Sequence, residues 1–406
     1  MTAYGAMNAN ATLSELRGLV HAPQTVLNFA KLCRRVQRLE EEQPGAYASE
    51  GYQSYLEEHM ARWHPQRSVL HLQQYQCERL QHQPWLGLAQ GFVLHGTTIE
   101  RLNTALGYLP RPPRHLALQN LRLKKKTFLE AMDAGVFDHI PSLQLDACPL
   151  RFATFEPVLR RLERLEALEE LRLNQCTLGA QHLDALAASP LAARLKTLGL
   201  SGTKSLKSKG MERLAALAPS FERLERLELA STGCTNKSLK ALAEASWAPS
   251  MTHIGLAKNP GLKLSGFKHL AQAGRLGWLV DTLGSETRLD LSEITLNEKL
   301  QAFLVDNHLL EGVTHLLLHW SKVTTLNALL TSEHLHTLES LDLSLNNGID
   351  PNAIVALAER AKLRVLDVSI PTALGDAFAE AIFTSPCSAH LEQFICNTGR
   401  QGSYGL

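Results

Sequence analysis

The sequence lacks most of the features that mark secreted, disulfide-bonded and membrane-spanning proteins. Its seven cysteines are odd in number and form no Cys-x-x-Cys pair, which argues against a disulfide framework. Residues 1–10 contain no basic stretch followed by an apolar segment, as a secretion signal would. No stretch approaches the ~18 uninterrupted apolar residues of a membrane-spanning helix. We therefore expect a cytoplasmic protein that does not enter a membrane.

The chain also lacks an excess of charge and the common catalytic motifs. Its 406 residues include 41 basic and 40 acidic side chains, and the net charge is +1. Binding to nucleic acid or to an anionic membrane is not expected from such a balance. We find no phosphate-binding loop, nucleophile elbow or His-Glu-x-x-His motif. The sequence consequently predicts no enzyme activity, no cofactor and no metal site.

What the sequence does contain is one pattern repeated along most of its length. The pattern is apolar, two variable residues, apolar, one variable residue, apolar, as in Leu168-x-x-Leu171-x-Leu173. The last apolar residue of each copy lies at position 94, 118, 145, 173, 200, 229, 256, 291, 318, 343, 368 or 396. Most copies are 24 to 29 residues apart, which is typical of a solenoid with one strand and one helix per turn. The step from 256 to 291 is 35 residues long.

Within each turn the pattern assigns positions to the core. The apolar residues of the strand alternate with residues on its opposite face. A small or polar residue follows the strand and is expected to be buried, where it would bridge backbone groups of neighbouring turns. These ladder residues are Cys148, Cys176, Thr203, Thr232, Asn259 and Asn346. Helical stripes such as Leu239, Leu242 and Ala243 then predict a helix that packs on the strand layer.

Residues 1–88 do not carry the repeat and are expected to be helical. We predict helices at 13–21, 26–42 and 49–63 and a further helical segment near 69–81. In the second of these, the apolar residues Phe29, Leu32, Cys33, Val36 and Leu39 form one stripe. Because a solenoid exposes the core of its first turn, this region is interpreted as a cap, and residues 89–406 as the solenoid.

The repeat length and the ladder residues resemble one known class of proteins. Repeats of 27 to 29 residues with Cys or Asn at the ladder resemble the ribonuclease-inhibitor-like leucine-rich repeats, over residues 89–406. Residues 85–94 look like the first repeat of bacterial cytoplasmic members that carry a helical segment before their repeats. The expected fold is therefore an α/β leucine-rich-repeat solenoid, a right-handed horseshoe of about 12 repeats with an N-terminal helical cap.

The strand register also predicts a surface for another protein. Trp320, Leu345 and Ile370 follow three successive strands, and exposed aromatic and aliphatic side chains are frequent anchors of interfaces. Burial against the loops is the alternative for Leu345 and Ile370. Ordinary solvated ion pairs are expected for Arg226 with Glu228 and for Arg288 with Asp290, whereas Asp342 and Asp367 lack such a neighbour. The expected partner site comprises Leu317, His319, Trp320, Asp342, Leu345, Asp367, Ile370 and Asp290.

Several alternatives stay open at this stage. A regulator that activates a small GTPase is the second functional hypothesis, and a purely structural or self-associating protein is the third. The long repeat is interpreted as an extra helical turn or loop on the convex side, with a functional loop as the alternative. His315 and His319 are interpreted as surface histidines because no third metal ligand is near in sequence. At the end of the repeats we expect one of three arrangements: the tail 397–406 folds over the C-terminal edge strand, a homodimer forms through this edge, or the edge is frayed in a monomer.

Overall fold

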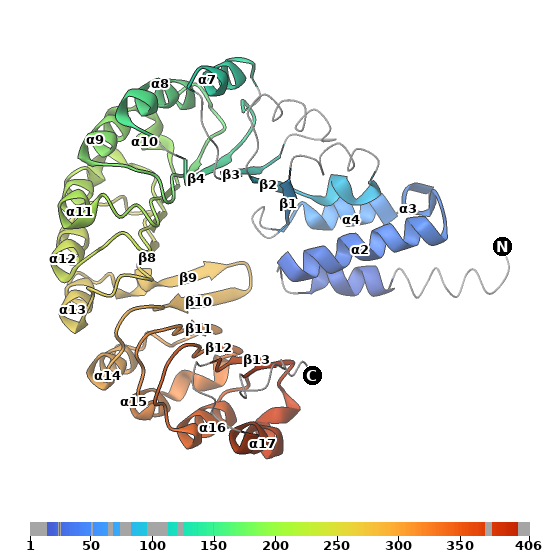
Figure 1. Ribbon diagram of the computed structural model, residues 1–406, viewed down its shortest axis with the longest axis vertical. Helices are drawn as coiled ribbons and strands as arrows, with labels where there is room; N and C mark the ends of the chain where they lie inside the picture. Colours follow the sequence, from blue (N-terminus) through green and yellow to red (C-terminus); the bar gives the residue numbers. More distant parts are fainter. Residues whose placement is uncertain are drawn as a thin grey trace. The chain divides into compact units, whose positions relative to one another are not determined.

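A computed structural model describes residues 14–22, 24, 26–49, 52–63, 68–73, 83–95, 113–119, 125–135, 137–148, 150–369 and 376–396. The chain forms two compact units. Unit 1 comprises residues 1–177 and 188–195, and unit 2 comprises residues 178–187 and 196–406. Figure 1 shows that strands alternate with helices along both units.

Unit 1 begins with helices, as predicted. Residues 14–21 are helical, and they are followed by α2 (Val26–Glu42), α3 (Ala46–Ser49) and α4 (Tyr52–Met60). The predicted stripe of α2 is buried, because Phe29, Leu32 and Val36 are at most 1% exposed. Leu88 belongs to the same apolar cluster, and the partly buried Leu70 packs against it. The Trp63 indole N–H donates to Val20 O at 3.1 Å. This packing fits the capping role, which stays a prediction.

The sheet of unit 1 starts earlier than the sequence suggested. Its strands are β1 (Val69–Gln73), β2 (Gly91–His95), β3 (His115–Gln119), β4 (Ser142–Asp146) and β5 (Glu170–Arg172), all paired in parallel in chain order. The helix expected near 69–81 is therefore wrong for 69–73, and residues 74–82 lie outside the described residues. Val69-Leu-His-Leu-Gln alternates like the strands of the repeat, and Leu70 pairs with Phe92 of β2.

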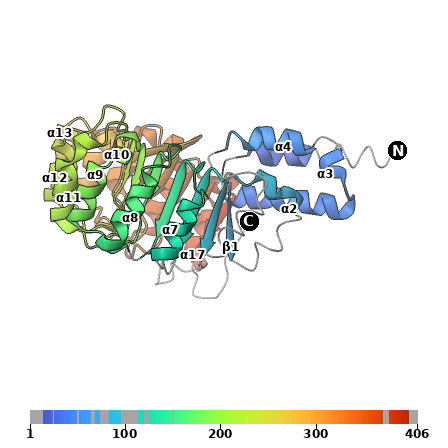
Figure 2. The ribbon, with the colours of Figure 1, turned by 90° about the horizontal axis from the view of Figure 1, so that it is seen from above.

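Helices cover one side of this sheet. They are α7 (Lys125–Asp133), α8 (Phe152–Leu162) and α10 (Pro190–Arg194), whereas the short helix η2 (Pro84–Leu88) packs on α2 and α4. Figure 2 shows α7 and α8 beside one another, outside the strands. The Arg194 guanidinium donates to the carbonyls of Leu162, Glu163 and Leu165 at 2.9–3.0 Å, which satisfies acceptors at the C-terminal end of α8.

Unit 2 continues the same alternation. Its strands are β6 (Thr197–Gly199), β7 (Arg226–Glu228), β8 (His253–Gly255), β9 (Val280–Leu283), β10 (Glu286–Asp290), β11 (His315–Leu317), β12 (Ser340–Asp342), β13 (Val365–Asp367) and β14 (Gln393–Ile395). Its helices are α9 (Ala180–Ala188), α11 (Lys207–Ala216), η3 (Ala218–Ser220), α12 (Asn236–Glu244), α13 (Leu264–Gln272), η4 (Leu276–Leu279), α14 (Glu298–Asp306), α15 (Asn327–Leu330), η5 (Glu333–Thr337), α16 (Pro351–Arg360), α17 (Asp376–Thr384) and η6 (Pro386–Ala389). The neighbouring helices α11, α12 and α13 stack in one layer on one side of the strands (Figures 1 and 2).

Each of the twelve expected repeats contains one strand, β2–β8 and β10–β14, where the pattern placed it. The central leucines Leu198, Leu227, Leu316, Leu341 and Leu366 are at most 1% exposed, because they face the helices. The predicted stripe Leu239, Leu242 and Ala243 of α12 is buried as well. The α/β solenoid architecture expected from the repeat is confirmed.

The ladder residues Asn259, Asn346 and Cys176 bridge to the preceding turn as predicted, whereas the Thr232 hydroxyl donates to Leu229 O of its own turn. Asn259 donates to Leu229 O of the preceding turn at 2.9 Å and accepts from Thr232 N and Cys234 N at 3.2 and 2.9 Å. Asn346 likewise donates to Leu318 O at 2.7 Å. The Cys176 thiol lies 3.1 Å from Leu145 O, and burial raises its pKa to about 12. This thiol is therefore structural, and it stays protonated at neutral pH.

The long repeat corrects a second expectation. Besides the short turn η4, its additional residues form β9, which pairs antiparallel with β10. The two strands are joined by Gly284 and Ser285, with Gly284 at φ 65°. The favoured interpretation, an extra helical turn or loop on the convex side, is therefore wrong for most of the segment. Unit 2 consequently has two parallel runs, β6–β8 and β10–β14, and the hairpin strand β9 lies at the edge of the second (Figure 1).

None of the described helices combines the length and apolar character needed to cross a bilayer. The last described strand, β14, ends the order of the six-stranded sheet. Residues 397–406 lie outside the described residues, so the dimer through this edge stays a prediction.

Candidate interaction surface

The open sheet face is the face of the unit 2 strands that points away from the helices. One backbone position after each strand places a side chain at the edge of the strand layer. Two residues after the last core leucine the chain adopts a left-handed conformation, at Ala147, Gln175, Gly202, Ser231, Lys258, Glu293, Trp320 and Leu345. The N–H of this residue donates to a carbonyl of the next turn, as Trp320 N does to Ser344 O at 2.9 Å. The left-handed turn directs the side chain away from the core.

Trp320 and Leu345 are the large apolar side chains exposed among the described residues, at 56% and 37%. They follow neighbouring strands, since Trp320 N bonds to the residue that precedes Leu345. The alternative of burial is therefore excluded for Leu345. Ile370, which the sequence grouped with Trp320 and Leu345, lies outside the described residues. Bulky residues are uncommon at positive φ, where each costs about 1–2 kcal/mol.

The register of β10–β14 brings the other predicted residues beside this pair. Asp290 pairs with Leu317, Leu317 with Asp342, and Asp342 with Asp367. All four side chains are partly exposed on the open sheet face. The structure therefore brings these four residues of the predicted site together in one column beside Trp320 and Leu345, and His319 lies next to Ser344.

The aspartates of this column also have a structural role that sequence reasoning missed. Each is followed two residues later by a serine whose backbone N–H it accepts: Asp290 from Ser292, Asp342 from Ser344 and Asp367 from Ser369, at 2.9–3.1 Å. Such bonds hold the strand end in its turn. The Ser344 hydroxyl in addition bonds to Asp342 and lies 2.7 Å from His319 Nδ1.

Asp342 and Asp367 nevertheless make no ion pair among the described residues. The sequence suggested this, because neither has a basic residue two positions away on the same face. Asp290 pairs only loosely with Arg288, at 3.5 Å and with both side chains more than one third exposed. The column of Asp290, Leu317, Asp342 and Asp367 therefore carries negative charge next to the apolar side chains of Trp320 and Leu345. A basic, partly apolar ligand would complement it.

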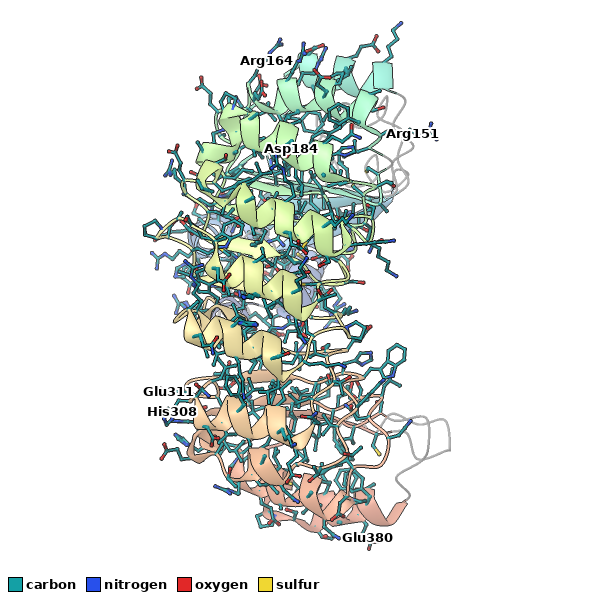
Figure 3. The ribbon with its side chains drawn as sticks, turned by 90° about the vertical axis from the view of Figure 1, so that its left-hand side faces the viewer. Arg151, Arg164, Asp184, His308, Glu311 and Glu380 are labelled. Carbon is teal, nitrogen blue, oxygen red and sulfur yellow. The ribbon has the colours of Figure 1, made fainter. Side chains whose placement is uncertain are left out.

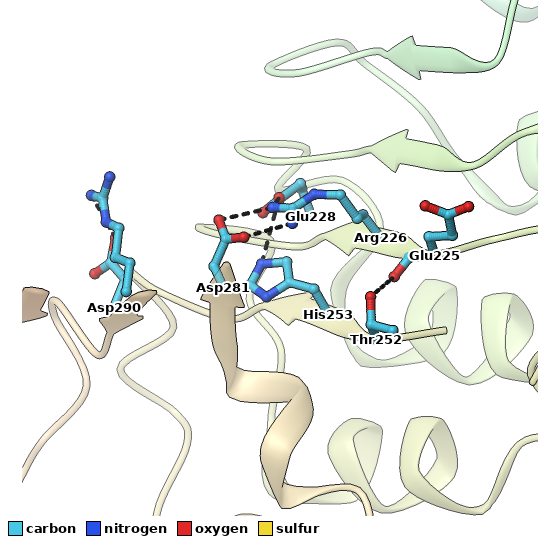
Figure 4. Close-up of polar contacts among 8 residues, drawn as sticks. Glu225, Arg226, Glu228, Thr252, His253, Asp281 and Asp290 are labelled. Atoms are coloured by element: carbon cyan, nitrogen blue, oxygen red, sulfur yellow. Dashed lines mark hydrogen bonds and ion pairs between the residues drawn. The ribbon is translucent and has the colours of Figure 1, made fainter. Parts of the chain in front are cut away.

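The open face beside the hairpin is different, as Figure 4 shows. Asp281 of β9 accepts two hydrogen bonds from the Arg226 guanidinium of β7, at 2.6 and 2.8 Å. Arg226 also bonds to Glu228 at 3.2 Å, and His253 Nε2 lies 3.5 Å from the Glu228 carboxylate. Gly255 leaves the space for that carboxylate, since a Cβ at this position would collide with Glu228. The hairpin thus closes a charge network across β7, β8 and β9.

This network is not the solvated pair that the sequence predicted. The Arg226, Glu228 and Asp281 side chains are only 18–22% exposed. Burial opposes ionisation of Asp281, but the hydrogen bonds and charge of Arg226 outweigh it and hold the Asp281 pKa below its ordinary value. Burial likewise disfavours charge on Arg226, yet its bonds to Asp281 raise the Arg226 pKa. The expectation of a solvated pair holds only for Arg288 and Asp290.

Asp281 was missed because its repeat was not read as a hairpin. Val280 to Leu283 and Glu286 to Leu289 flank the two-residue loop Gly284-Ser285, which is a recognised hairpin pattern. His315 and His319 are half-buried, and they lie beside the Thr314 and Ser344 hydroxyls at 2.9 and 2.7 Å. A second pair of histidines, His308 and His334, lies in another part of unit 2.

No protein-family model matches the sequence, and no curated protein matches it. Solved structures resemble the fold. A chain of the crystal structure of the Rad7 and Elc1 complex in yeast matches with a TM-score of 0.54 and 15% identity, over 96% of this chain and 91% of that chain. A chain of the TLR13–ssRNA13 complex matches with a TM-score of 0.41 and 16% identity, over 81% of this chain and 52% of that one.

Proposed function

We propose that this chain, an α/β protein with a leucine-rich-repeat fold, is a scaffold that binds another protein on the open sheet face of unit 2. The proposed contact residues are Leu317, His319, Trp320, Asp342, Leu345, Asp367, Ile370 and Asp290. Trp320 and Leu345 are the anchors, and the aspartates are the surrounding polar contacts.

The observation that supports this proposal is the exposed pair Trp320 and Leu345 in left-handed turns. The same position in other turns holds Gln175, Gly202 or Ser231, which are small or polar. Two bulky apolar residues at this position expose apolar surface and strain the backbone, so they do not serve the fold. Strained and exposed residues of this kind are frequent at binding sites.

The charge of the surface indicates the kind of partner. The carboxylates of Asp342 and Asp367 lie beside the anchors and form no ion pair among the described residues. A partner segment with an apolar side chain against Trp320 and with lysine or arginine next to it would satisfy both features. Electrostatic contacts of this type mainly raise the association rate and select the partner.

Affinity capture with the purified chain tests the proposal directly. Wild type and Trp320→Ala are exposed to a lysate of the source cells, bound proteins are quantified, and the dissociation constant of any specific partner is then measured. We expect Trp320→Ala to weaken binding by about 1–3 kcal/mol, or roughly 5- to 150-fold, because it removes the central anchor.

Gln175→Ala is the matched control, since Gln175 is exposed in the same left-handed turn of unit 1. It should leave the affinity within about twofold of wild type. Equal binding by wild type, Trp320→Ala and Asp342→Lys, with unchanged circular dichroism, contradicts the proposed surface.

A further inference from the structure

Three potential metal ligands meet on the outer side of unit 2, away from the open sheet face. His308, Glu333 and His334 each offer one ligand atom, and these atoms all lie within 4.8 Å of one another. His334 Nε2 is 3.7 Å from a Glu333 carboxylate oxygen, and the two imidazole rings are edge to face with centroids 5.8 Å apart. Figure 3 shows His308 at the margin of the helix layer, next to Glu311. Two consecutive turns of the repeat thus contribute to one cluster.

The backbone at His308 is held in a conformation that ordinarily selects glycine. Helix α14 ends in a Schellman motif, with His308 N bonded to Val305 O and Leu309 N to Leu304 O, both at 3.0 Å. His308 occupies the left-handed position of this motif at φ 56°. The preceding turn ends α13 with the same two bonds, and there the left-handed residue is Gly274.

This comparison between neighbouring turns isolates the histidine as a costly choice. A side chain at a left-handed position costs about 1–2 kcal/mol, whereas glycine is free of that penalty. The helix end needs no histidine, since Gly274 supports the same motif one turn earlier. A residue that strains a helix end and projects toward a second imidazole indicates a role other than folding.

The second histidine is held in place but lacks a hydrogen bond at one nitrogen. Ser332 caps η5 by accepting from His334 N at 3.2 Å, and the His334 side chain is 19% exposed. His334 Nε2 is buried and has no hydrogen-bond partner among the described residues. A buried polar atom without a partner costs about 1–3 kcal/mol, which a metal bond would remove.

We propose that His308, Glu333 and His334 bind one divalent transition-metal ion, and that Zn²⁺ fits the site best. Two imidazoles with one carboxylate form a ligand set that Zn²⁺ prefers, whereas Mg²⁺ and Ca²⁺ prefer oxygen ligands alone. Tetrahedral coordination at about 2.1 Å places ligand atoms about 3.4 Å apart. The 3.7 Å between His334 Nε2 and Glu333 is close to that value, and the exposed Glu333 and His308 side chains can adjust.

Such an ion links the end of α14 to η5 of the next turn. Three protein ligands leave a fourth position of tetrahedral zinc open to water or to a side chain of another molecule. The ion therefore stabilises the contact between the two turns and creates a second, separate point of attachment on the outer side.

Titration of the metal-stripped full chain with ZnCl₂ tests the proposal, by calorimetry and by the thermal unfolding midpoint. We expect one site whose occupancy raises the midpoint. His308→Gly and His334→Ala should each weaken this binding at least about tenfold, because each loses a ligand. His308→Gly is the most informative variant. It should unfold without metal at the same or a higher temperature than wild type, yet lose the increase caused by Zn²⁺.

His336→Ala is the matched control, because His336 is an exposed histidine of the same short helix outside the cluster. It should bind Zn²⁺ as wild type does. Zinc affinity within twofold of wild type in His308→Gly, or an equal loss in His336→Ala, overturns the proposal. If His334→Ala does not fold, His308→Gly and Glu333→Gln decide the question on their own.

Discussion

The two parallel runs of unit 2, β6–β8 and β10–β14, have the same core but different open faces. In the first, Arg226, Glu228 and His253 are occupied by one another and by Asp281 of the hairpin. In the second, Asp342 and Asp367 hold their own turns, and Trp320 and Leu345 are exposed. A repeat fold thus preserves the residues that pack, while the open face varies from turn to turn.

The ladder shows where the two runs separate. Thr203, Thr232 and Asn259 follow β6–β8, and Ser321 and Asn346 follow β11 and β12. At the same position after β10 the chain has Ile294, which is fully buried. The apolar ladder residue follows the strand that pairs with β9, so the hairpin and the loss of the polar ladder coincide. The ladder side chain thus supplies no polar bridge at this junction, whereas Asn259 and Ser321 supply one on either side of it.

The largest expected effect is the loss of a ladder asparagine. Asn259→Ala removes two acceptor contacts for Thr232 N and Cys234 N and a donor to Leu229 O. Because these buried backbone groups are left without partners, unfolding should become easier by about 3 kcal/mol. Urea unfolding measures the loss, and hydrogen exchange should show faster exchange at Thr232 and Cys234.

Ser321→Ala calibrates this prediction across the junction. Ser321 makes one bond to the preceding turn, to Leu291 O at 2.8 Å. Its removal should cost about 1 kcal/mol. Equal losses of unfolding free energy in Asn259→Ala and Ser321→Ala would show that the number of ladder hydrogen bonds does not set the stability of the two runs.

An intermediate effect is expected from the network beside the hairpin. Asp281→Asn removes the negative charge opposite Arg226 and one of its two acceptor oxygens, and it should destabilise the fold by about 1–2 kcal/mol near neutral pH. Since the Asp281 pKa is lowered in the folded state, its contribution is present above the unfolded pKa and is lost as pH falls through the folded pKa. The variant should therefore lose less stability than wild type as pH falls from about 5 through the folded pKa of Asp281.

Asp342→Asn serves as the control for this pH dependence. Asp342 forms no ion pair among the described residues, and an asparagine oxygen can still accept from Ser344 N. Its stability near neutral pH should stay within about 0.5 kcal/mol of wild type. If it behaves like Asp281→Asn, the two open faces do not differ in the way that the ion pairs indicate.

The smallest effect concerns the left-handed turns. Trp320→Gly relieves the strain at φ 50° and should stabilise the chain by a few tenths to about 1 kcal/mol, although it removes the proposed anchor. Gly202→Ala, at φ 72° in the first run, should destabilise by a similar amount. Thermal unfolding of both variants measures these changes. A clear loss of stability in Trp320→Gly would mean that Trp320 serves the fold.

The sequence by itself determined the repeating core and the exposure of Trp320. Leucine spacing placed β2–β8 and β10–β14, the ladder position identified Asn259 and Asn346, and the register placed Leu317 beside Asp342. These features depend on local periodicity, because each strand and helix of a repeat packs mainly on its immediate neighbours.

Only the tertiary structure decided which distant side chains meet. Asp281 reaches Arg226 because β9 folds back as an antiparallel strand, and His308 faces His334 because two turns stack. Neither contact follows from a repeat pattern, since both depend on how an irregular segment or a helix end lies against the next turn. Strand β1 was missed for a related reason. Its short alternating segment is too brief to identify alone, and its pairing with β2 defines it as a strand.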